Sequence, residues 1–487
     1  GALQRARLQN LLLNDIYNGP QRLLRDGFLP PALVYANPNF LRACRGISVP
    51  NGTYLHLAAI DLARSPSGEW WALSDRLQAP GGIGYVLENR AIVSRLLPRS
   101  FRALQVQRLN TFFSTFRQTL VDLAPSATMW PRIVLLTPGI HSRAHYEHSL
   151  LARHLGFTLV EGGDLTVRDQ RVFLKTVEGP QRVDVVVRQV NDALCDPLEL
   201  RGDSVLGVPG LVQTARAGNV LIANALGSAT AETSAFIPSL PLLCRHLLDE
   251  DLVLPSTAAW WCGEASDRNH VLANLDSLII KRAFPTRQRE TQSGQELSQG
   301  ERDELRARIE RNPHRYVGQV RVPLSHAPVW TDAKFESRPV VLRVYVAARG
   351  DSYVALPGGL TKVSQSTSNP VTGLQIGGGS KDTWILGGIE SARTHLPVRL
   401  ESRAAERMLT GVPSRIADNL FWLGRYSERL EHTTHLLRAI SSRLLDEFEI
   451  RTLEQIDALT TLSTNPFKYL IAPRLIAGTL MVPFLVL

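Results

Sequence analysis

Short apolar segments alternate with helical segments between residues 130 and 225, and this alternation limits the fold more than any other feature of the sequence. Parallel strands need a crossover connection, usually a helix, so regular alternation favours strands that lie parallel in one sheet. The expected strands are 133–137, 157–160, 171–175, 183–188 and 220–223, and the expected helices are 144–155 and 209–217. The sequence therefore predicts an α/β fold with α+β parts and a partly parallel sheet.

A second feature is a predicted hairpin nearer the start of the chain. Residues 53–62 alternate between apolar and polar positions, and residues 70–73 form a short apolar segment after a Ser-Pro-Ser-Gly turn. Asp61 ends the first strand and is expected to face Ser74 at the end of the second. One carboxylate alone is a poor magnesium site, because Mg²⁺ usually takes one or two carboxylates together with substrate phosphates. A glycine-containing turn then leads into a helix predicted at 85–97.

Charge and cysteine content exclude several classes of protein. The chain of 487 residues is long enough for two to four domains, and its net charge is +9. The basic residues are scattered, with no dense Lys/Arg run interleaved with aromatic residues, so we expect no nucleic-acid partner. The four cysteines lie far apart and form no CxxC pair, which indicates buried thiols in a reducing compartment. We therefore expect a cytoplasmic protein.

Lys281 and a glycine-rich segment are two candidate anion sites. Lys281 ends the apolar strand predicted at 275–281, where it either contacts an anionic partner or extends to the surface. The segment 377–382 either places backbone N–H groups and a lysine around phosphate oxygens, or forms a flexible hairpin tip. Spacing alone does not separate these alternatives.

Two further clusters also have a structural alternative. His141, His145 and His148 have helical spacing, but no cysteine or distant histidine completes a metal site, so a polar helix face is the favoured interpretation. Arg188 and Asp192 follow a predicted strand, where α/β proteins often place groups that contact a ligand. A capped turn explains these two residues nearly as well.

Many ordered stretches of residues 3–400 resemble the circularly permuted ATP-grasp family, the relatives of glutathionylspermidine-synthase-type ligases. The stretches that carry this resemblance are 14–17, 52–61, 79–90, 136–151, 159–165, 206–211, 215–225, 261–263, 316–319, 356–363 and 377–384. Residues 411–443 resemble the start of the helical alpha-E domain, with Ser427-Glu428-Arg429 among the matching residues, and here that domain is cut short. The resemblance implies an ATP-grasp core in permuted order, followed by a C-terminal helical segment.

The resemblance also implies an ATP-dependent ligase that joins a carboxylate to an amine in a peptide-like bond. ATP would phosphorylate the carboxylate and the amine would attack the acyl phosphate, with Mg²⁺ and lysines stabilising the phosphoryl charge. The substrates would be small-molecule or peptide carboxylates and amines, and the alpha-E segment would bind a protein partner. The residues carried over are Asp61 for the metal; Lys281, Gln319, Gly377, Gly378, Gly379, Ser380 and Lys381 for the nucleotide; and Arg338 and Lys381 for catalysis.

The sequence departs from the family pattern in three parts of the ATP site. The usual Glu-Asp-Asn-x-Arg metal motif is Ser-Asp-Arg-Leu-Gln at 74–78, so Arg76 stands where the family has a magnesium ligand. The first nucleotide lysine is replaced by Ser234, and the glycine-rich lid after Lys281 is replaced by residues 282–287. Two functions follow: a working ligase, or a non-catalytic scaffold or interaction subunit beside an active paralogue. In the second case Arg76 and the two arginines of 282–287 would hold a phosphate without a metal.

The predicted organisation has five parts: 1–127 and 128–230 are the N-terminal part and the α/β subdomain, 231–405 is the rest of the ATP-grasp core, 409–450 is the alpha-E-like segment, and 451–487 is an apolar tail. The tail resembles a fragment of the permease subunit of lipid-trafficking ABC transporters. Its residues 469–487 are apolar enough for a membrane span that Pro473 and Arg474 interrupt, so any membrane contact is expected through the tail alone. A fused reading frame is the favoured origin of this tail.

Overall fold

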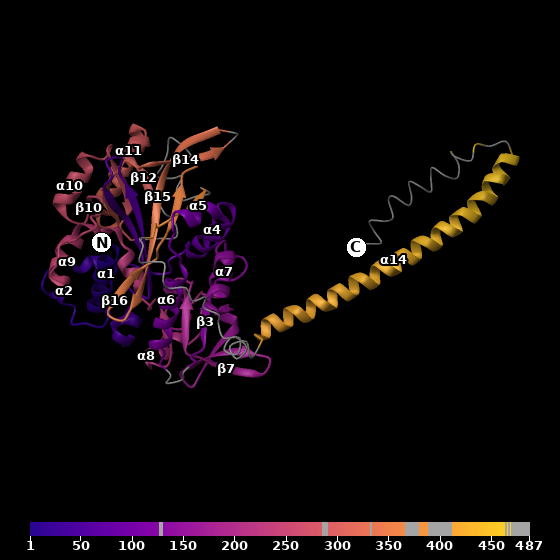
Figure 1. The fold of residues 1–487 in the computed structure, drawn as a ribbon, viewed down its shortest axis with the longest axis horizontal. Helices are drawn as coiled ribbons and strands as arrows, with labels where there is room; N and C mark the ends of the chain where they lie inside the picture. Colours follow the sequence, from indigo (N-terminus) through magenta and orange to yellow (C-terminus); the bar gives the residue numbers. More distant parts are fainter. Residues whose placement is uncertain are drawn as a thin grey trace. The chain divides into compact units, whose positions relative to one another are not determined.

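The computed structural model describes residues 1–125, 130–284, 291–331, 334–365, 379–387 and 412–462, together with residues 465 and 468. The chain divides into two compact units, residues 1–411 and residues 412–487, and each is described by itself. Among the described residues, the first unit contains four β-sheets with helices around them, and the second contains one long helix (Figure 1).

A large antiparallel sheet runs through the first unit, and β15 (Lys334–Arg349) is its longest strand (Figure 1). β1 (Leu57–Arg64) lies between β15 and β2 (Trp70–Arg76), so segments from opposite ends of the unit's sequence become neighbours. The predicted hairpin of β1 and β2 is confirmed, with Asp61 opposite Ser74 and a β-bulge directly after this pair. The other strands are β14 (His326–Thr331), β16 (Ser352–Ala355), β17 (Leu360–Val363) and β18 (Ser380–Asp382).

A second sheet is parallel, as the alternation of strands and helices predicts. Its four strands lie in the order β4-β3-β8-β9, and every neighbouring pair is parallel. The strands are β3 (Ile133–Leu136), β4 (Thr158–Val160), β8 (Val185–Arg188) and β9 (Leu221–Ala223), and the helices are α7 (His145–Leu155) and α8 (Leu211–Arg216).

The predicted strand at 171–175 belongs to a separate antiparallel sheet rather than to the parallel one. This sheet consists of β5 (Leu165–Arg168), β6 (Arg171–Thr176) and β7 (Gly179–Val183). Asp169 and Gln170 connect β5 to β6, and both have positive φ, which is the conformation of a two-residue hairpin turn. The chain therefore makes a local meander before it returns to the parallel sheet.

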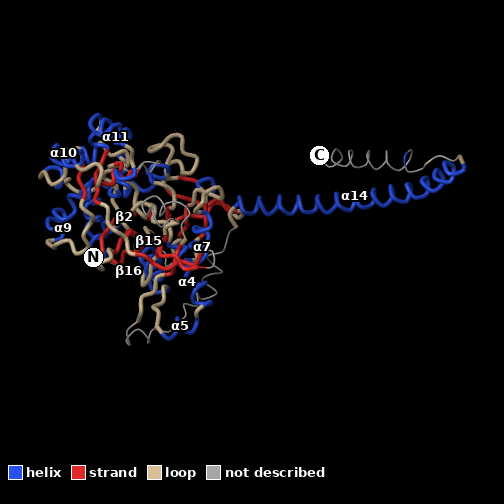
Figure 2. Tube along the Cα trace, turned by 90° about the horizontal axis from the view of Figure 1, so that it is seen from above, coloured by secondary structure: helices blue, strands red, loops and turns tan. Residues whose placement is uncertain are grey.

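A fourth sheet, which is four-stranded and antiparallel, carries two helices on its apolar face. Its strands are β10 (Ala259–Trp261), β11 (Leu278–Arg282), β12 (Thr291–Ser293) and β13 (Tyr316–Val320). The helices are α10 (Ala265–Ala273) and α11 (Gln299–Arg311), which lie side by side in Figure 2 and contribute Val271, Leu305 and Ile309 to one buried cluster. Ser298 and Glu301 form a capping box, which explains why α11 begins where it does.

The remaining helices of the first unit include one at Ile83–Leu96, close to the helix predicted at 85–97. The helical region 98–122 is divided into two helices. Gln105, at the division, has φ of +48°, which no helix residue can adopt. The helices are α1 (Ala2–Tyr17), α2 (Arg22–Arg25), α3 (Pro31–Tyr35), α4 (Ile83–Leu96), α5 (Pro98–Ala103), α6 (Asn110–Asp122) and α9 (Leu240–Leu248). All four cysteines are free and buried, which confirms the expected buried thiols.

The second unit is described as one helix, α14 (Ser414–Thr461). The helical segment predicted at 411–443 is confirmed, and the helix continues through residue 450, where the alpha-E-like segment was expected to end. No described helix is sufficiently long and apolar to cross a membrane. The membrane span predicted at 469–487 lies outside the described residues.

Candidate functional site

One face of the large sheet carries a row of charged and polar side chains. Neighbouring strands place Ser74, Asp61, Arg343, Leu360 and Asp382 directly opposite one another, from β2 across β1, β15 and β17 to β18. Side chains of directly opposite residues lie on the same face of a sheet. The row therefore joins residues from distant parts of the sequence.

Asp61 lies in the middle of this row and contacts three cationic side chains. The Arg343 guanidinium donates to both carboxylate oxygens, from Nε at 2.7 Å and from Nη2 at 2.8 Å. Arg76 Nε and Ser74 Oγ donate to Oδ2 at 3.3 Å and 3.2 Å, and Lys362 Nζ lies 3.8 Å from Oδ1. Burial alone would raise the pKa of Asp61, but the charge and hydrogen bonds of Arg343 hold it well below its usual range. Asp61 is therefore ionised at neutral pH and already paired.

A glycine turn fixes Arg343 from a second direction. Arg343 Nη1 donates to the Gly81 carbonyl at 2.8 Å, and the Tyr345 hydroxyl donates to the same oxygen at 3.1 Å. Gly82 has φ of +101°, and a Cβ at this position would lie 2.5 Å from the Tyr345 hydroxyl. Only glycine fits such a close approach. The close contact with Tyr345 therefore accounts for the glycine in this turn, and no ligand is needed to explain it.

The residues around Asp61 do not fit the magnesium ion that the family resemblance implies. Mg²⁺ needs near-octahedral oxygen ligands, usually one or two carboxylates with phosphates and waters. Both oxygens of Asp61 instead accept hydrogen bonds from Arg343, and Asp75 lies on the opposite face of β2, where it pairs with Arg5 at 2.6 Å. The part of the chain that the structure describes holds no group of three His, Cys, Asp or Glu residues suited to a metal ion. The assignment of Asp61 to a metal stays a prediction, and its surroundings do not support it.

Lys281 and Gln319, two predicted nucleotide residues, contact each other directly. They lie on neighbouring strands β11 and β13 and on the same face of their sheet, because Gln319 is opposite Ile279 and Lys281 is opposite Val317. Lys281 Nζ donates to Gln319 Oε1. The pKa of Lys281 is lowered to about 8, first by burial and then by the charge of Arg76, while the charge of Asp61 acts to raise it. Lys281 is therefore close enough to the Asp61 cluster to respond to its charges.

The other predicted site residues lie elsewhere. Arg338 is on the opposite face of β15 from Arg343, because side chains alternate along a strand, and it pairs with Glu336 at 2.8 Å. Lys381 is opposite Thr361, so it faces away from Asp61, while Ser380 Oγ contacts Asn89. Gly379 precedes β18. Gly377, Gly378 and the segment 285–290 lie outside the described residues.

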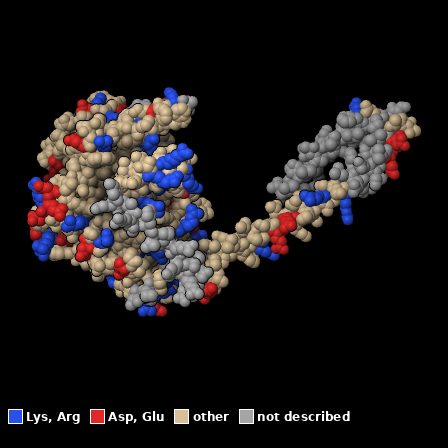
Figure 3. All heavy atoms as spheres, in the orientation of Figure 1, with Lys and Arg blue, Asp and Glu red and all other residues tan. Residues whose placement is uncertain are grey.

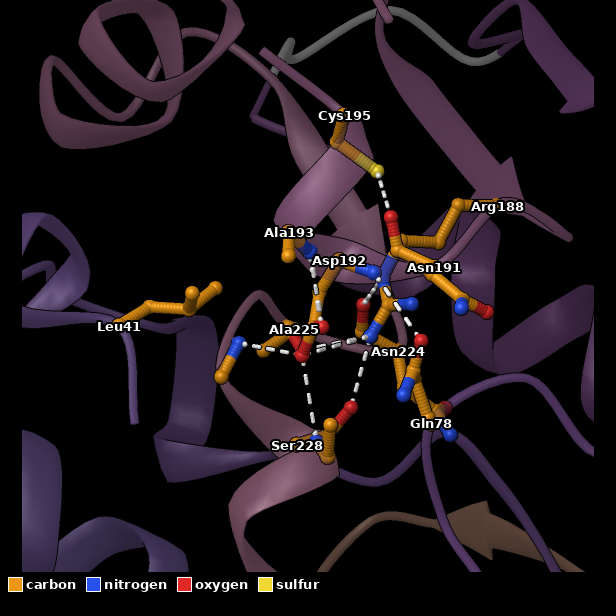
Figure 4. Close-up of polar contacts among 12 residues, drawn as sticks. Leu41, Gln78, Arg188, Asn191, Asp192, Ala193, Cys195, Asn224, Ala225 and Ser228 are labelled. Atoms are coloured by element: carbon orange, nitrogen blue, oxygen red, sulfur yellow. Dashed lines mark hydrogen bonds and ion pairs between the residues drawn. The ribbon is translucent and has the colours of Figure 1, made fainter. Parts of the chain in front are cut away.

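Arg188 crosslinks buried backbone instead of facing a cavity. Its guanidinium donates to the carbonyls of Asn224 at 2.8 Å and Ala225 at 3.1 Å and to Ser228 Oγ at 2.7 Å. Figure 4 shows these groups converging with Asp192, whose carboxylate lies 3.9 Å from Arg188. Arg188 is 1% exposed. Of the two predicted alternatives, these contacts favour the structural turn over a ligand site.

The histidine cluster is also part of the structure. The side chain of His148 is buried and hydrogen-bonded to Thr137 Oγ1 at 2.9 Å, and burial lowers its pKa to about 4. Its neighbour Glu147 accepts a hydrogen bond from the backbone N–H of Gly82 and so holds the glycine turn onto α7. His145 contacts Ser149. The favoured polar helix face is therefore not what the structure has, because His148 and Glu147 are buried and His141 precedes α7.

The sequence analysis missed Arg343 and Lys362, although both contact Asp61. Arg343 is the single charged residue among the apolar positions 339–348 of β15, which is a signal that a buried partner is required. Its partner lies 282 positions away, on a strand that pairs with β15 only in the folded chain. The sequence pattern therefore indicated a paired arginine but not which carboxylate pairs with it.

Comparison with known families gives two matches. Residues 1–364 match the family described as circularly permuted ATP-grasp type 2. Residues 412–474 match a family described as a predicted alpha-helical domain with a conserved ER motif. The second match extends well into the segment 451–487, whose resemblance to a transporter permease has no support from these findings.

Two similar proteins are both named as uncharacterized. The chain is 39% identical over 388 residues to the uncharacterized protein sll0335 of Synechocystis, covering 80% of each chain. It is 37% identical over 443 residues to the uncharacterized protein Rv2567 of Mycobacterium tuberculosis, which covers 90% of this chain and 49% of that protein. The chain thus spans about half the length of this mycobacterial relative.

One solved structure is matched at low similarity. It is an apo glutathione synthetase-like effector, GSS30, of Globodera pallida, with a TM-score of 0.47 and 11% identity over 74% of this chain and 82% of that one. The match of residues 1–364, together with the relative that is 39% identical over four fifths of both chains, decides the family. This chain belongs to the circularly permuted ATP-grasp family and carries an alpha-E-type helical segment at its C-terminal side.

Proposed function

We propose that the first unit binds ATP or another phosphate anion through Arg76 and Lys281, without a magnesium ion held by Asp61. In this proposal the chain is a non-catalytic ATP-grasp subunit that works beside an active paralogue. The observation that carries the proposal is the pairing of Asp61 with Arg343, Arg76 and Lys362.

Positive charge exceeds negative charge around Asp61. Arg343, Arg76 and Lys362 lie 2.7–3.8 Å from its carboxylate, and Lys281 lies within the reach of its charge. Among the described contacts of Asp61, three cations share one carboxylate, while Glu147 is a further acidic group whose charge acts on Arg343. Cations in a partly buried site attract anions strongly, because water screens them less there than at the surface. A phosphate chain is an anion of suitable charge.

Arg76 and Lys281 are the cations best suited to contact this ligand. Arg343 directs its three nitrogens at Asp61 and Gly81 and is buried. Within the described part of the chain, Arg76 donates a hydrogen bond to Asp61 from Nε alone, and its side chain is 25% exposed. A guanidinium presents two parallel N–H groups that match phosphate oxygens. The Lys281 ammonium has three donors and gives one of them to Gln319, which also orients it.

The ligase is the second candidate function, and the family match over residues 1–364 favours it. ATP-grasp ligases activate a carboxylate through ATP and magnesium, so a working ligase requires metal-dependent binding of the nucleotide. The two functions therefore differ in their response to magnesium.

Calorimetric titration of the full chain with ATP, in magnesium and in EDTA, separates these functions. We expect the two dissociation constants to agree within about threefold, because cations of the protein replace the metal. Binding that requires magnesium, or release of phosphate when carboxylates and amines are added, would support the ligase. The absence of binding in both conditions would exclude phosphate recognition at this site.

A variant that restores the family motif is expected to change the metal response. Ser74→Glu combined with Arg76→Asn adds a carboxylate beside Asp61 and removes one cation from it. We expect magnesium to tighten ATP binding by about tenfold or more in this variant, since two adjacent carboxylates form a magnesium site. The matched control is Ser67→Glu with Arg64→Asn, which makes the same charge change at the end of β1 and in the turn that joins it to β2. An equal magnesium response in the control would contradict the proposal.

The pH dependence of ATP binding tests the role of Lys281. A lysine is charged below its pKa, and that of Lys281 is lowered to about 8. We expect the affinity for ATP to fall by about tenfold between pH 7 and pH 9, as the ammonium loses its proton. Lys281→Arg stays charged over this range and is expected to remove most of the decrease. Titration calorimetry at three pH values measures the dissociation constant of ATP. If Lys281→Arg shows the same decrease in affinity as the wild type, Lys281 does not contact the ligand.

A further inference from the structure

A groove lies among α4, α5, α6 and α7, outside the residues assigned to the phosphate site. Its volume is about 540 Å³, which is the size of a site for a small ligand or a short peptide segment. Leu87, Leu109 and Leu150 contribute apolar surface to its lining, and Arg108, Arg153 and His154 contribute exposed polar ends. The groove therefore combines apolar contact surface with basic groups.

The groove has an excess of positive charge. Arg108 and Arg153 are exposed and have no ion-paired or hydrogen-bonded side-chain partner among the described residues. Arg90 also lines the groove, but it pairs with Asp382 at 2.7 Å, and Glu88 is the single acidic residue of the lining. Two arginine charges against one carboxylate leave a net attraction for anions.

The surface beside the groove is basic and apolar at the same time. Residues 88–117 include six arginines and one glutamate, and Figure 3 shows Lys and Arg gathered over α4 and α5. Leu96 is 72% exposed, and Leu97 and Leu104 are also exposed on the same two helices and the turn that follows. Exposed apolar side chains among arginines are typical of surfaces that bind another protein.

Nucleic acid fits this groove less well than a peptide does. Proteins that bind single strands stack bases on exposed aromatic rings. Phe101 lines the groove, but its ring packs edge-on against Trp384 at 5.6 Å and lies under the Arg90 guanidinium. His154 likewise contacts the Phe113 ring at 4.8 Å. The basic groups therefore lack a free stacking platform beside them.

We propose that this groove binds an acidic peptide segment of a protein partner. Aspartate or glutamate side chains of the peptide pair with Arg108 and Arg153, and a leucine-type side chain packs on Leu109 and Leu150. The proposal does not depend on the phosphate site, because neither Arg76 nor Lys281 lines the groove.

Fluorescence anisotropy with the full chain tests this proposal. The probe is a fluorescein-labelled peptide that repeats Asp-Glu-Leu, and the variant is Arg108→Glu with Arg153→Glu. We expect binding that weakens as salt is added and that falls by about tenfold or more in the variant, because two attractive contacts become repulsive. The control is Arg45→Glu with Arg349→Glu, which makes the same charge change at two exposed arginines that do not line the groove.

Each outcome of the peptide test either supports or overturns the proposal. Loss of peptide binding in the groove variant, with the control unaffected, supports the proposal. Equal loss in both variants would mean attraction to net charge alone and would overturn it, as would no binding of the peptide. Tighter binding of labelled oligouridylate through Arg108 and Arg153 would assign the groove to nucleic acid instead. ATP titration of the groove variant is expected to be unchanged, which keeps this test separate from that of the phosphate site.

Discussion

Replacement of Arg343 by leucine is expected to lower the free energy of unfolding of the first unit by about 3–5 kcal/mol. Arg343 and Asp61 are both buried, and the two hydrogen bonds between them measure 2.7 and 2.8 Å. Leucine leaves the Asp61 carboxylate buried with weaker partners, and it leaves the Gly81 carbonyl with only the Tyr345 hydroxyl as a side-chain donor. Arg76 and Lys362 remain near Asp61, so the loss is expected toward the lower end of this range.

Urea unfolding followed by tryptophan fluorescence measures this loss, and Arg338→Leu is the matched control. Arg338 lies on the same strand, and its ion pair with Glu336 is more exposed than that of Arg343 with Asp61, with side chains 18% and 25% exposed against 10% and 9%. A more exposed pair contributes less, because water and salt screen it. A similar loss in both variants would mean that arginine side chains stabilise β15 by packing rather than through Asp61.

The double variant Asp61→Asn/Arg343→Leu separates the pair from its surroundings. Removal of both charges is expected to recover part of the stability lost in Arg343→Leu, because no unpaired buried charge remains. A double variant no more stable than Arg343→Leu would contradict an unpaired charge as the cause.

The stability that Arg343 provides is expected to depend on pH. The pKa of Asp61 in the folded chain lies well below its unfolded value of about 4, so its contribution is complete above that pH. As the pH falls below about 4, the unfolded chain takes up a proton at Asp61 before the folded chain does. The difference between wild type and Arg343→Leu is therefore expected to shrink on acidification. A difference that stays constant from neutral pH to pH 3 would contradict the ion pair.

Local sequence patterns predicted much of the fold, because they concern neighbouring residues. The β1–β2 hairpin and the parallel sheet follow from alternation and from the helices between strands. The same patterns placed Asp61 opposite Ser74 correctly. These patterns predicted the strand β6 but not the sheet that contains it, because a strand of a parallel sheet and a strand of a local meander have the same apolar pattern. Asp169 and Gln170 were the available signal for the meander.

The candidate site was less predictable, because it depends on the register between distant strands. A shift by one residue moves every side chain of a strand to the other face. Arg338 and Lys381 match family positions in sequence, yet the register places both on the face opposite Asp61. The same register places Arg343 on the face of Asp61, where the two side chains pair. Residue type and spacing do not contain this information.

Arg188→Met is expected to destabilise the first unit by about 3–5 kcal/mol while leaving the phosphate site in place. Methionine preserves much of the aliphatic stem but removes the guanidinium donor of the Asn224 carbonyl and leaves the Ala225 carbonyl with the backbone N–H of Ser228 at 3.3 Å. It also removes the cation nearest to Asp192, whose carboxylate is buried. The control is Arg216→Met, because Arg216 forms an exposed pair with Glu199 that contributes little.

This variant also decides between the two interpretations of the residues that follow β8. If Arg188 crosslinks the backbone, Arg188→Met lowers the free energy of unfolding, and Arg188→Lys recovers little, because a lysine cannot reach the carbonyl groups and Ser228 in the same fork geometry. If Arg188 instead contacts a ligand, Arg188→Met weakens ATP binding with stability unchanged. Its 1% exposure and its hydrogen bonds to the carbonyls of Asn224 and Ala225 favour the first result, since a guanidinium that already donates in these directions has little capacity left for a phosphate.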